Sequence, residues 1–298
     1  GSASFPAAEY RKISKLKDAG FNAIRTAHYP PSLALLEACD ELGILVMDEA
    51  FDMWNVPKQE LDYSLWFADR WDEDIKCMVL RDRNHPCVIS YSIGNEIIER
   101  DCMSDGGIWA EKLSNEIRKY DATRFVTSAL CGLWYKNDED APEEYKKEFE
   151  RLPEPEEDGT DAGWDKYSYD YVKPLDIVGY NYLYKRYERD HKLYPDRVMW
   201  GAETHALDFY HSWQSVMRNN YVLGDFTWTA YDNLGEAGAG RFLWERDGFI
   251  SKLSLGEYPW RSCYQGDFDL CGYRRPQSYF RESIWKEDCE PRIFTTHP

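Results

Sequence analysis

Short apolar runs rich in β-branched residues recur along this chain, and a helix-forming stretch or a long loop follows each of them. The clearest run, residues 86–96, contains Val88, Ile89 and Ile93 and ends in Glu96. A run with so few polar residues is typical of a strand in a sheet that is covered on both faces. The sequence therefore predicts an α/β fold with a parallel sheet.

The alternation continues through most of the sequence. We predict strands over residues 21–26, 44–47, 86–96, 125–129, 176–181, 197–203 and 221–228. We predict helices over residues 6–19, 33–42, 65–83, 108–120, 209–219 and 276–286. This rhythm indicates a (β/α)8 TIM barrel, and a chain of 298 residues is typical of one such domain.

The first predicted element is a helix, whereas a TIM barrel begins with a strand. Residues 1–5 are too few and too small to form a buried strand. We therefore expect the barrel to lack its first strand in this chain, and we hypothesise that residues 1–298 are one domain of a longer multidomain protein. Such a barrel would keep two unpaired sheet edges.

Two segments interrupt the alternation. Residues 134–170 are acidic and broken by proline, so we interpret them as an acidic surface insertion. Residues 235–275 contain glycine, tryptophan and tyrosine and follow the last strand. Because the carboxyl-terminal ends of the strands form the functional face of a TIM barrel, we predict that this second segment forms a wall of the functional pocket.

Charge and hydropathy exclude several classes of partner. The chain has 36 basic and 54 acidic residues, a net charge of −18, which argues against binding to nucleic acid or to an anionic membrane surface. No apolar run approaches the roughly 18 residues that span a membrane. The eight cysteines form no Cys-x-x-Cys pair, so we expect reduced thiols in a reducing compartment.

Two of the predicted strands end in a glutamate, Glu96 and Glu203. Parallel strands of a barrel direct their carboxyl ends to one rim, so both carboxylates are expected on the same face. Two carboxylates on one rim are the groups that hydrolyse a glycosidic bond. The 12 Trp, 22 Tyr and 13 Phe residues supply aromatic faces that can stack on sugar rings, although many of them are expected in the core.

Six segments together carry a family resemblance. They are Phe-Asn-Ala-Ile-Arg-Thr-Ala-His-Tyr-Pro at 21–30, Asp-Glu-Ala at 48–50, the run from Asn-His-Pro to Gly-Asn-Glu at 84–96, Gly-Tyr-Asn-Tyr at 179–182, Gly-Ala-Glu-Thr at 201–204 and Gly-Asp-Phe-Thr-Trp at 224–228. In this order the chain resembles, over nearly its whole length, the catalytic barrel of glycoside hydrolase family 2. That family includes β-galactosidases, β-glucuronidases and β-mannosidases.

The resemblance implies a retaining hydrolase of β-glycosides. Glu96 matches the acid/base and Glu203 the nucleophile of a double displacement, Asn95 matches a residue that holds the sugar 2-hydroxyl, and Arg25 and Tyr182 match partners of the nucleophile. Further substrate-binding candidates are His28, Trp228, His205 and Asp232. A retaining mechanism predicts carboxyl groups about 5 Å apart, whereas about 9 Å would favour inversion.

The sequence also departs from known patterns of the family. Magnesium-binding β-galactosidases carry Glu-x-His after the third strand, and residues 50–54 lack it, so we expect no metal and no cofactor. The Asn-x-Lys pair by which β-glucuronidases recognise a carboxylate is missing at 233–235. A β-galactosidase is therefore the first choice by elimination, with β-glucuronidase and β-mannosidase as alternatives.

Other classes of protein remain to be weighed. A catalytically silent carbohydrate-binding barrel would be free to lose a carboxylate, and both are present. An aldolase or a metal-dependent hydrolase would need a lysine or a histidine cluster at strand ends, which the pattern does not offer. Asp48 and Glu49 are expected to orient neighbours. From the resemblance we also expect accessory β-sandwich domains and the bacterial cytoplasm, with secretion left open, and a homo-oligomer is compatible with the sequence.

Overall fold

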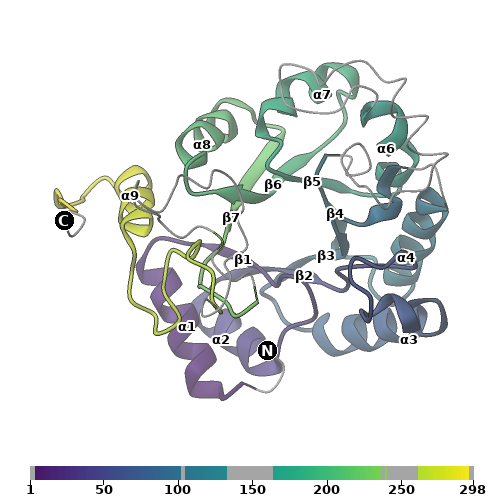
Figure 1. The fold of residues 1–298 in the computed structure, drawn as a ribbon, viewed down its shortest axis with the longest axis horizontal. Helices are drawn as coiled ribbons and strands as arrows, with labels where there is room; N and C mark the ends of the chain where they lie inside the picture. Colours follow the sequence, from purple (N-terminus) through teal and green to yellow (C-terminus); the bar gives the residue numbers. More distant parts are fainter. Residues whose placement is uncertain (1–3, 102–104, 133–163, 236–238, 240–260, 295–298) are drawn as a thin grey trace.

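The protein is described by a computed structural model that covers residues 4–101, 105–132, 164–235, 239 and 261–294. Seven parallel strands form one sheet in the order of the sequence, curved into a nearly closed barrel with helices around it (Figure 1). The strands are β1 (Ala23–Arg25), β2 (Leu45–Glu49), β3 (Val88–Asn95), β4 (Phe125–Leu130), β5 (Ile177–Asn181), β6 (Met199–His205) and β7 (Val222–Trp228). The prediction of a TIM barrel is confirmed.

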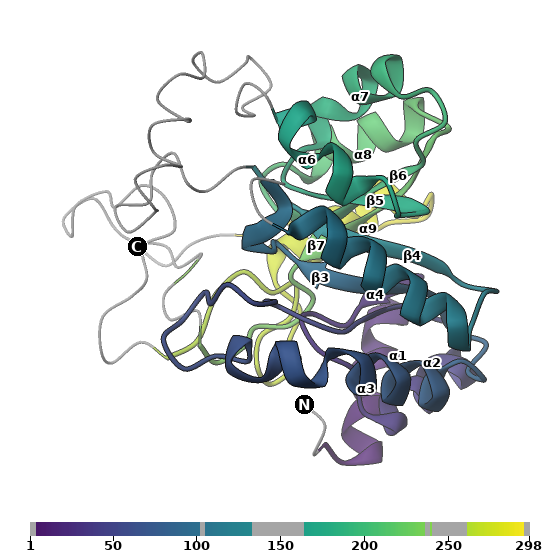
Figure 2. The same ribbon diagram turned by 90° about the vertical axis from the view of Figure 1, so that its right-hand side faces the viewer.

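Helices connect the strands on the outside of the barrel. They are α1 (Pro6–Asp18), α2 (Leu33–Leu42), α3 (Ser64–Asp82), α4 (Gly106–Tyr120), α6 (Trp164–Val172), α7 (Tyr187–Leu193), α8 (Phe209–Arg218) and α9 (Pro276–Trp285). Helices α3, α4 and α6 follow one another along one side of the barrel (Figure 2). The six helices predicted within the described residues are all present, with ends that differ by no more than two residues, and a short helix also expected around residues 144–152 lies outside the described residues.

Local sequence explains why these elements begin and end where they do. The hydroxyl of Ser32 accepts a hydrogen bond from the backbone N–H of Leu35 at 3.2 Å and so caps α2. Gly43 ends the helix with a φ of 71°, a left-handed conformation that glycine adopts without steric cost. The chain then enters β2 directly, and its parallel pairing with β1 on one side and β3 on the other continues the sheet.

One part of the predicted acidic insertion is wrong. Residues 164–170 belong to the barrel helix α6, because Trp164, Tyr167 and Tyr171 recur on one side of the helix and are buried against the core. Residues 134–163 of the insertion lie outside the described residues, as do residues 240–260 of the segment predicted to form a pocket wall. Helix α7 was not predicted, since its polar sequence has no continuous apolar stripe.

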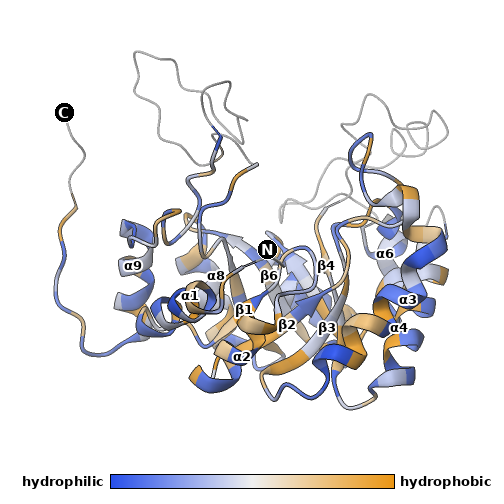
Figure 3. Ribbon diagram, turned by 90° about the horizontal axis from the view of Figure 1, so that it is seen from below, coloured by the Kyte–Doolittle hydropathy of each residue, from blue (hydrophilic) through white to orange (hydrophobic). Residues whose placement is uncertain are grey.

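Apolar side chains fill the barrel and the layer between strands and helices. Hydrophobic residues run along β2 and β3 in the middle of the molecule (Figure 3). A second cluster joins side chains from four strands, namely Met47, Ala129, Ile177, Trp200 and Ala202. Met47 and Glu49 are two positions apart on β2 and therefore share one face of the strand. The polar residues at the ends of the strands thus stand on an apolar layer.

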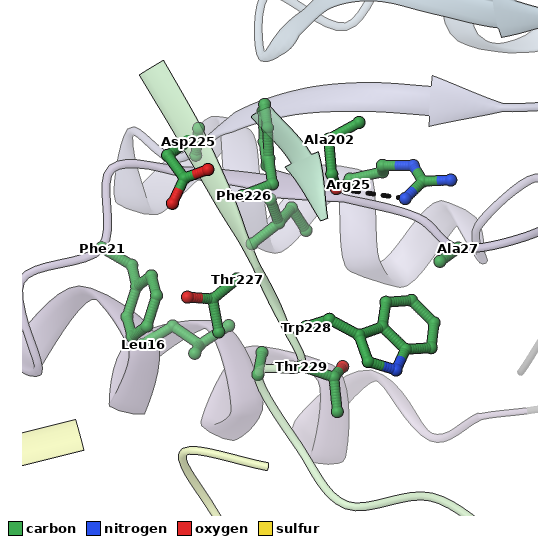
Figure 4. A pocket seen from close by; sticks show the side chains of 13 residues that line it. Leu16, Phe21, Arg25, Ala27, Ala202, Asp225, Phe226, Thr227, Trp228 and Thr229 are labelled. Carbon is green, nitrogen blue, oxygen red and sulfur yellow. Dashed lines mark hydrogen bonds between the residues drawn. The ribbon is translucent and has the colours of Figure 1, made fainter. Parts of the chain in front are cut away.

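The sheet does not close among the described residues. Strands β1 and β7 are its two ends, and no described strand lies between them. A pocket lies where these ends face each other, lined by Arg25 of β1, Ala202 of β6 and Phe226 and Trp228 of β7 (Figure 4). The expectation of a barrel that lacks one strand therefore holds for the part of the chain that the structure describes.

Two further sequence predictions concern thiols and membranes. The seven cysteines within the described ranges are all free, as expected for reduced thiols: Cys39, Cys77, Cys87, Cys131, Cys263, Cys271 and Cys289. Among the helices that the structure describes, none has the length and apolar character needed to cross a membrane.

Candidate active site

Both glutamates lie at the carboxyl-terminal rim of the barrel. Glu96 directly follows β3, and its backbone N–H donates to the carbonyl of Ala129 on β4 at 2.7 Å. Glu203 lies on β6, in register with Asn181 of β5. The side-chain amide of Asn181 donates to Oε1 of Glu96 at 3.0 Å. Asn181 therefore links the positions of the two carboxylates, which lie near enough for the charge of Glu96 to act on Glu203.

Protein donors hold both carboxylate oxygens of Glu203. Arg25 Nη1 donates to Oε1 at 2.8 Å, and the hydroxyl of Tyr182 donates to Oε2 at 2.7 Å. The side chain is almost wholly buried, with 4% of Glu203 exposed. Burial and the nearby charge of Glu96 raise the pKa of Glu203, while Arg25 and Tyr182 act in the opposite direction. Arg25 and Tyr182 thus oppose the rise in the pKa of Glu203 that burial and Glu96 cause.

Arg25 is the centre of the charged network. Its Nε and Nη2 bind the two carboxylate oxygens of Glu49, each at 2.9 Å, and its Nη2 also donates to Oδ1 of Asn95 at 2.7 Å. A second bond from Nη1 reaches the carbonyl of Ala202 at 3.1 Å (Figure 4). The guanidinium lowers the pKa of Glu49 although that side chain is completely buried. Arg25 thus fixes Glu49, Asn95 and Glu203 relative to one another.

His28 and Trp228 form another part of the rim. His28 Nδ1 lies 2.8 Å from Oε1 of Glu49, and the imidazole stacks on the indole of Trp228 with ring centroids 5.2 Å apart. His28 Nε2 lies 3.4 Å from the side-chain amide nitrogen of Asn95. The structure therefore brings these two predicted residues to the glutamate cluster, where one ring nitrogen is held by Glu49 and the other faces Asn95.

Tyr182 and His205 pack against each other. Their rings stack with centroids 4.2 Å apart, which supports the phenol that binds Glu203. Burial lowers the pKa of His205, so the neutral imidazole is favoured. Tyr182 has a φ of 62° and Glu96 a φ of 41°, both in the left-handed region that residues other than glycine seldom adopt. Two residues of the cluster thus have unusual backbone conformations, a feature that concentrates at functional sites.

Asp232 is placed differently from the other predicted residues. Its carboxylate pairs with Arg275 and accepts the backbone N–H of Gly266 at 2.8 Å. Cys263 lies beside it at 3.7 Å. None of these described contacts belongs to the cluster around Glu203, so the structure shows Asp232 joining two segments of the chain and does not bring it to the glutamates.

Sequence reasoning missed three residues of the rim. Asn181 ends β5, and the rule that found the glutamates at strand ends would have found it too. Asp52 and Lys58 lie in the loop after β2, where no periodic pattern identifies contacts. Asp52 Oδ1 accepts a hydrogen bond from the side-chain amide of Asn95 at 3.0 Å, and Lys58 Nζ donates to the carbonyl of Asn95 at 2.9 Å.

One group of metal-ligating side chains is found among the described residues, and it lies away from the glutamates. Asp40, His85 and Cys87 approach one another at the beginning of β3, the end opposite to Glu96. His85 Nδ1 lies 2.6 Å from Oδ2 of Asp40. The other oxygen of Asp40, Oδ1, accepts a hydrogen bond from the backbone N–H of Cys87 at 2.9 Å. Burial raises the pKa of the Cys87 thiol, which favours the protonated form. These hydrogen bonds account for the proximity of the three side chains, so we interpret the group as structural.

Comparison with known proteins identifies the family to which the chain belongs. The model of the glycosyl hydrolases family 2 TIM barrel domain matches residues 9–251. A glycosyl hydrolase family 2 member from Bacteroides cellulosilyticus has a solved structure that superposes with a TM-score of 0.78 and 39% sequence identity, over 96% of this chain and 32% of that one.

Two curated relatives are similar over nearly all of this chain. The β-galactosidase BoGH2A of Bacteroides ovatus is 26% identical over 93% of this chain and 36% of its own length. A putative β-glucuronidase of Formosa agariphila is 28% identical over 96% of this chain and 28% of its own length. This chain thus spans about a third of the length of these relatives. On the match of the family model, the chain belongs to glycosyl hydrolase family 2, whose TIM barrel domain it contains.

Proposed function

We propose that this chain is the catalytic barrel of a retaining β-glycoside hydrolase, with Glu203 as nucleophile and Glu96 as acid/base. The observation that carries the proposal is that the two carboxylates differ in burial and in hydrogen-bond partners. Glu203 is buried with both oxygens bound by Arg25 and Tyr182, whereas Glu96 receives a hydrogen bond from the neutral amide of Asn181. A double displacement requires this asymmetry, because one carboxyl group must be ionised while the other carries a proton.

The reaction follows from these roles. A carboxylate oxygen of Glu203 attacks the anomeric carbon while Glu96 gives its proton to the departing glycosidic oxygen, and a covalent glycosyl-enzyme forms as the aglycone leaves as an alcohol. The now ionised Glu96 takes a proton from water, whose oxygen attacks the anomeric carbon and releases Glu203. Two inversions give net retention, and each catalytic group returns to its starting state.

Substrate-binding groups surround the two glutamates. Asn95 is proposed to bind the sugar 2-hydroxyl, since Arg25 and Asn181 fix its amide oxygen, with Asn181 at 3.1 Å. Trp228 is proposed to stack on the sugar ring and His28 to contact a ring hydroxyl. The role of His205 is proposed to run through Tyr182, on which it stacks. Asp232 stays a weaker substrate-binding candidate because its described contacts lie elsewhere.

A β-galactoside is the proposed substrate. The missing Asn-x-Lys pair and the net charge of −18 disfavour a uronide, and one relative bears the name β-galactosidase. The putative β-glucuronidase among the relatives keeps a uronide as the alternative. We also propose that the chain is one domain of a longer multidomain protein with accessory β-sandwich domains, and that the protein is cytoplasmic.

The test is a panel of p-nitrophenyl β-glycosides with the full-length protein that contains this chain. We expect hydrolysis of the β-galactoside, and we expect Glu203→Gln to lower kcat/KM by at least about 10³-fold. Glu96→Gln should spare the step that expels nitrophenolate but slow the hydrolysis of an alkyl β-galactoside far more, since only the poor leaving group needs the proton.

The controls separate chemistry from folding. Thermal unfolding of each variant checks that the barrel is intact, and proton NMR of the first product reports the anomeric configuration. A wild-type protein that is inactive on every β-glycoside, or a Glu203→Gln variant with unchanged kcat/KM, would exclude the proposed hydrolase. An inverted first product would exclude the double displacement alone.

A further inference from the structure

An ion pair in the loop between β2 and α3 meets the glutamate cluster at Asn95. Lys58 Nζ donates to Oδ1 of Asp52 at 2.6 Å and to the backbone carbonyl of Asn95 at 2.9 Å. The side-chain amide of Asn95 donates to the same Oδ1 at 3.0 Å. Two groups from one loop therefore bind both the backbone and the side chain of the residue that precedes Glu96.

The loop that carries the pair is held by its own hydrogen bonds. Asp62 Oδ2 accepts the backbone N–H groups of Lys58 and Gln59 at 2.7 and 2.8 Å. Glu99 Oε1 accepts those of Asn55 and Val56, each at 2.9 Å. Such anchoring places Asp52 and Lys58 on a preorganised segment, which is what a binding residue needs in order to act at a fixed position.

The two oxygens of Asp52 differ in their partners. Oδ1 accepts hydrogen bonds from Lys58 and Asn95, whereas Oδ2 has no hydrogen-bond partner among the described residues. The side chain is 32% exposed, and Oδ2 is not among the buried polar atoms that lack a partner. By contrast, both oxygens of Glu203 and both of Glu49 are occupied by protein donors. Asp52 is thus a carboxylate next to Asn95 that keeps an accessible acceptor.

We propose that Asp52 is a substrate-binding residue whose Oδ2 accepts a hydrogen bond from the sugar 3-hydroxyl, and that Lys58 is the positioning residue that holds it. This inference rests on the proposed function, in which Asn95 binds the 2-hydroxyl. On the sugar ring the 3-hydroxyl is next to the 2-hydroxyl, and in the site the carboxylate of Asp52 is next to the side chain of Asn95. An ionised carboxylate binds a hydroxyl donor strongly, so the site is suited to a glycoside whose 3-hydroxyl is unsubstituted.

The test combines enzyme variants with a changed substrate. Wild type and Asp52→Ala are assayed on p-nitrophenyl β-galactoside and on its 3-deoxy analogue, in the full-length protein. We expect Asp52→Ala to lower kcat/KM by about 10- to 100-fold on the parent substrate, the loss of one hydrogen bond to a charged group. On the 3-deoxy substrate the same variant should lose clearly less, since the partner hydroxyl is already gone and only the lost contact with Asn95 remains.

Matched controls identify a merely structural role. Lys58→Met keeps the carboxylate but frees it to move, so a smaller loss that is partly restored in Lys58→Arg is expected. A binding assay in the Glu203→Gln background, with galactose and 3-deoxygalactose titrated by calorimetry, gives a readout that needs no turnover. There Asp52→Ala should weaken the binding of galactose more than that of 3-deoxygalactose.

Each outcome bears on the proposal. Equal losses of Asp52→Ala on the parent and 3-deoxy substrates would overturn the assignment of the 3-hydroxyl while leaving the hydrolase intact. A loss that depends on the aglycone and not on the 3-hydroxyl would instead assign Asp52 to the leaving-group side and also overturn it. A wild-type protein that hydrolyses no β-glycoside would overturn both the function and this inference.

Discussion

Two neighbouring acids on β2, Asp48 and Glu49, are both completely buried, and their surroundings differ in every other respect. Glu49 faces the rim, where Arg25, His28 and Ser92 bind its oxygens. Alternation along the strand directs Asp48 to the other face, where its charged neighbour is another carboxylate, Asp82 of α3. The pKa of Glu49 is therefore lowered, and that of Asp48 is raised by burial and by Asp82.

The difference shows what decides ionisation in this barrel. Burial alone opposes charge at both positions, so the guanidinium of Arg25 is what makes Glu49 an anion. On the other face Arg81 binds both oxygens of Asp82, each at 2.6 Å, and burial beside Asp82 raises the pKa of Asp48, which favours its protonated form. One strand thus presents an anion to the functional rim and a neutral acid to the helix layer.

The largest effect is expected from removing the guanidinium. Arg25→Met leaves Glu49 and Glu203 buried without their shared counter-charge, so the free energy of unfolding should fall by about 3–5 kcal/mol and hydrolysis should be lost. Urea unfolding of the two proteins measures the first quantity. Arg81→Met is the matched control, because Arg81 is partly exposed and its loss should cost less. Equal losses of unfolding free energy in the two variants would refute the conclusion that Arg25 contributes more to stability than Arg81.

A smaller effect is expected at Glu203, which shares Arg25 with Glu49 but has a phenol as its second partner. Tyr182→Phe removes one hydrogen bond to a charged group, so kcat/KM on the proposed substrate should fall about 10- to 100-fold. Because Tyr182 lowers the pKa of Glu203, the acidic limb of the pH–rate profile should move to higher pH. An unshifted acidic limb would show that Arg25 alone sets the ionisation of Glu203.

The smallest effect is expected on the other face of β2. Asp48→Asn mimics the protonated acid and can still donate to Asp82, so unfolding free energy at neutral pH should rise by about 1 kcal/mol. The raised pKa of Asp48 means that its contribution to stability is complete below the ordinary pKa of an aspartate and is lost as pH rises through the folded value. Glu49 acts with the opposite sign, losing its contribution as pH falls.

The measurement is unfolding by urea between pH 4 and pH 8. The stability difference between Asp48→Asn and wild type should grow with pH, whereas Asp82→Asn, which removes the acceptor that Arg81 also needs, should destabilise. A difference that does not change with pH would mean that Asp48 is ionised in the folded protein and that the comparison between the two faces is wrong.

Sequence patterns were sufficient for the barrel and for the two glutamates of the rim. Glu96 and Glu203 follow from apolar runs that end in a carboxylate, because parallel strands bring their ends to one side, whereas Arg25 and Asn95 were identified only through the family resemblance. The roles given to them came from the family resemblance. The pattern contains nothing about loops, where Lys58 reaches Asn95 across 37 positions of the chain.

One error and one unexpected contact have physical causes. Helix α6 is buried through aromatic residues within an otherwise acidic stretch, so the charge of the segment concealed its apolar side. Asp232 follows β7, as a rim residue should, but Arg275, 43 positions later, binds its carboxylate. A contact between two irregular segments leaves no periodic signal, and only the folded structure reveals it.

The left-handed backbones of Glu96 and Tyr182 set two aims of protein engineering against each other. Each such residue costs on the order of 1 kcal/mol relative to glycine, so a screen for heat resistance would enrich glycine at both positions. Those survivors would melt later but hydrolyse alkyl glycosides far more slowly, since the proposed proton donor and the phenol beside the nucleophile would be gone. Selection for thermal stability and selection for catalytic turnover should therefore favour different residues at these two codons.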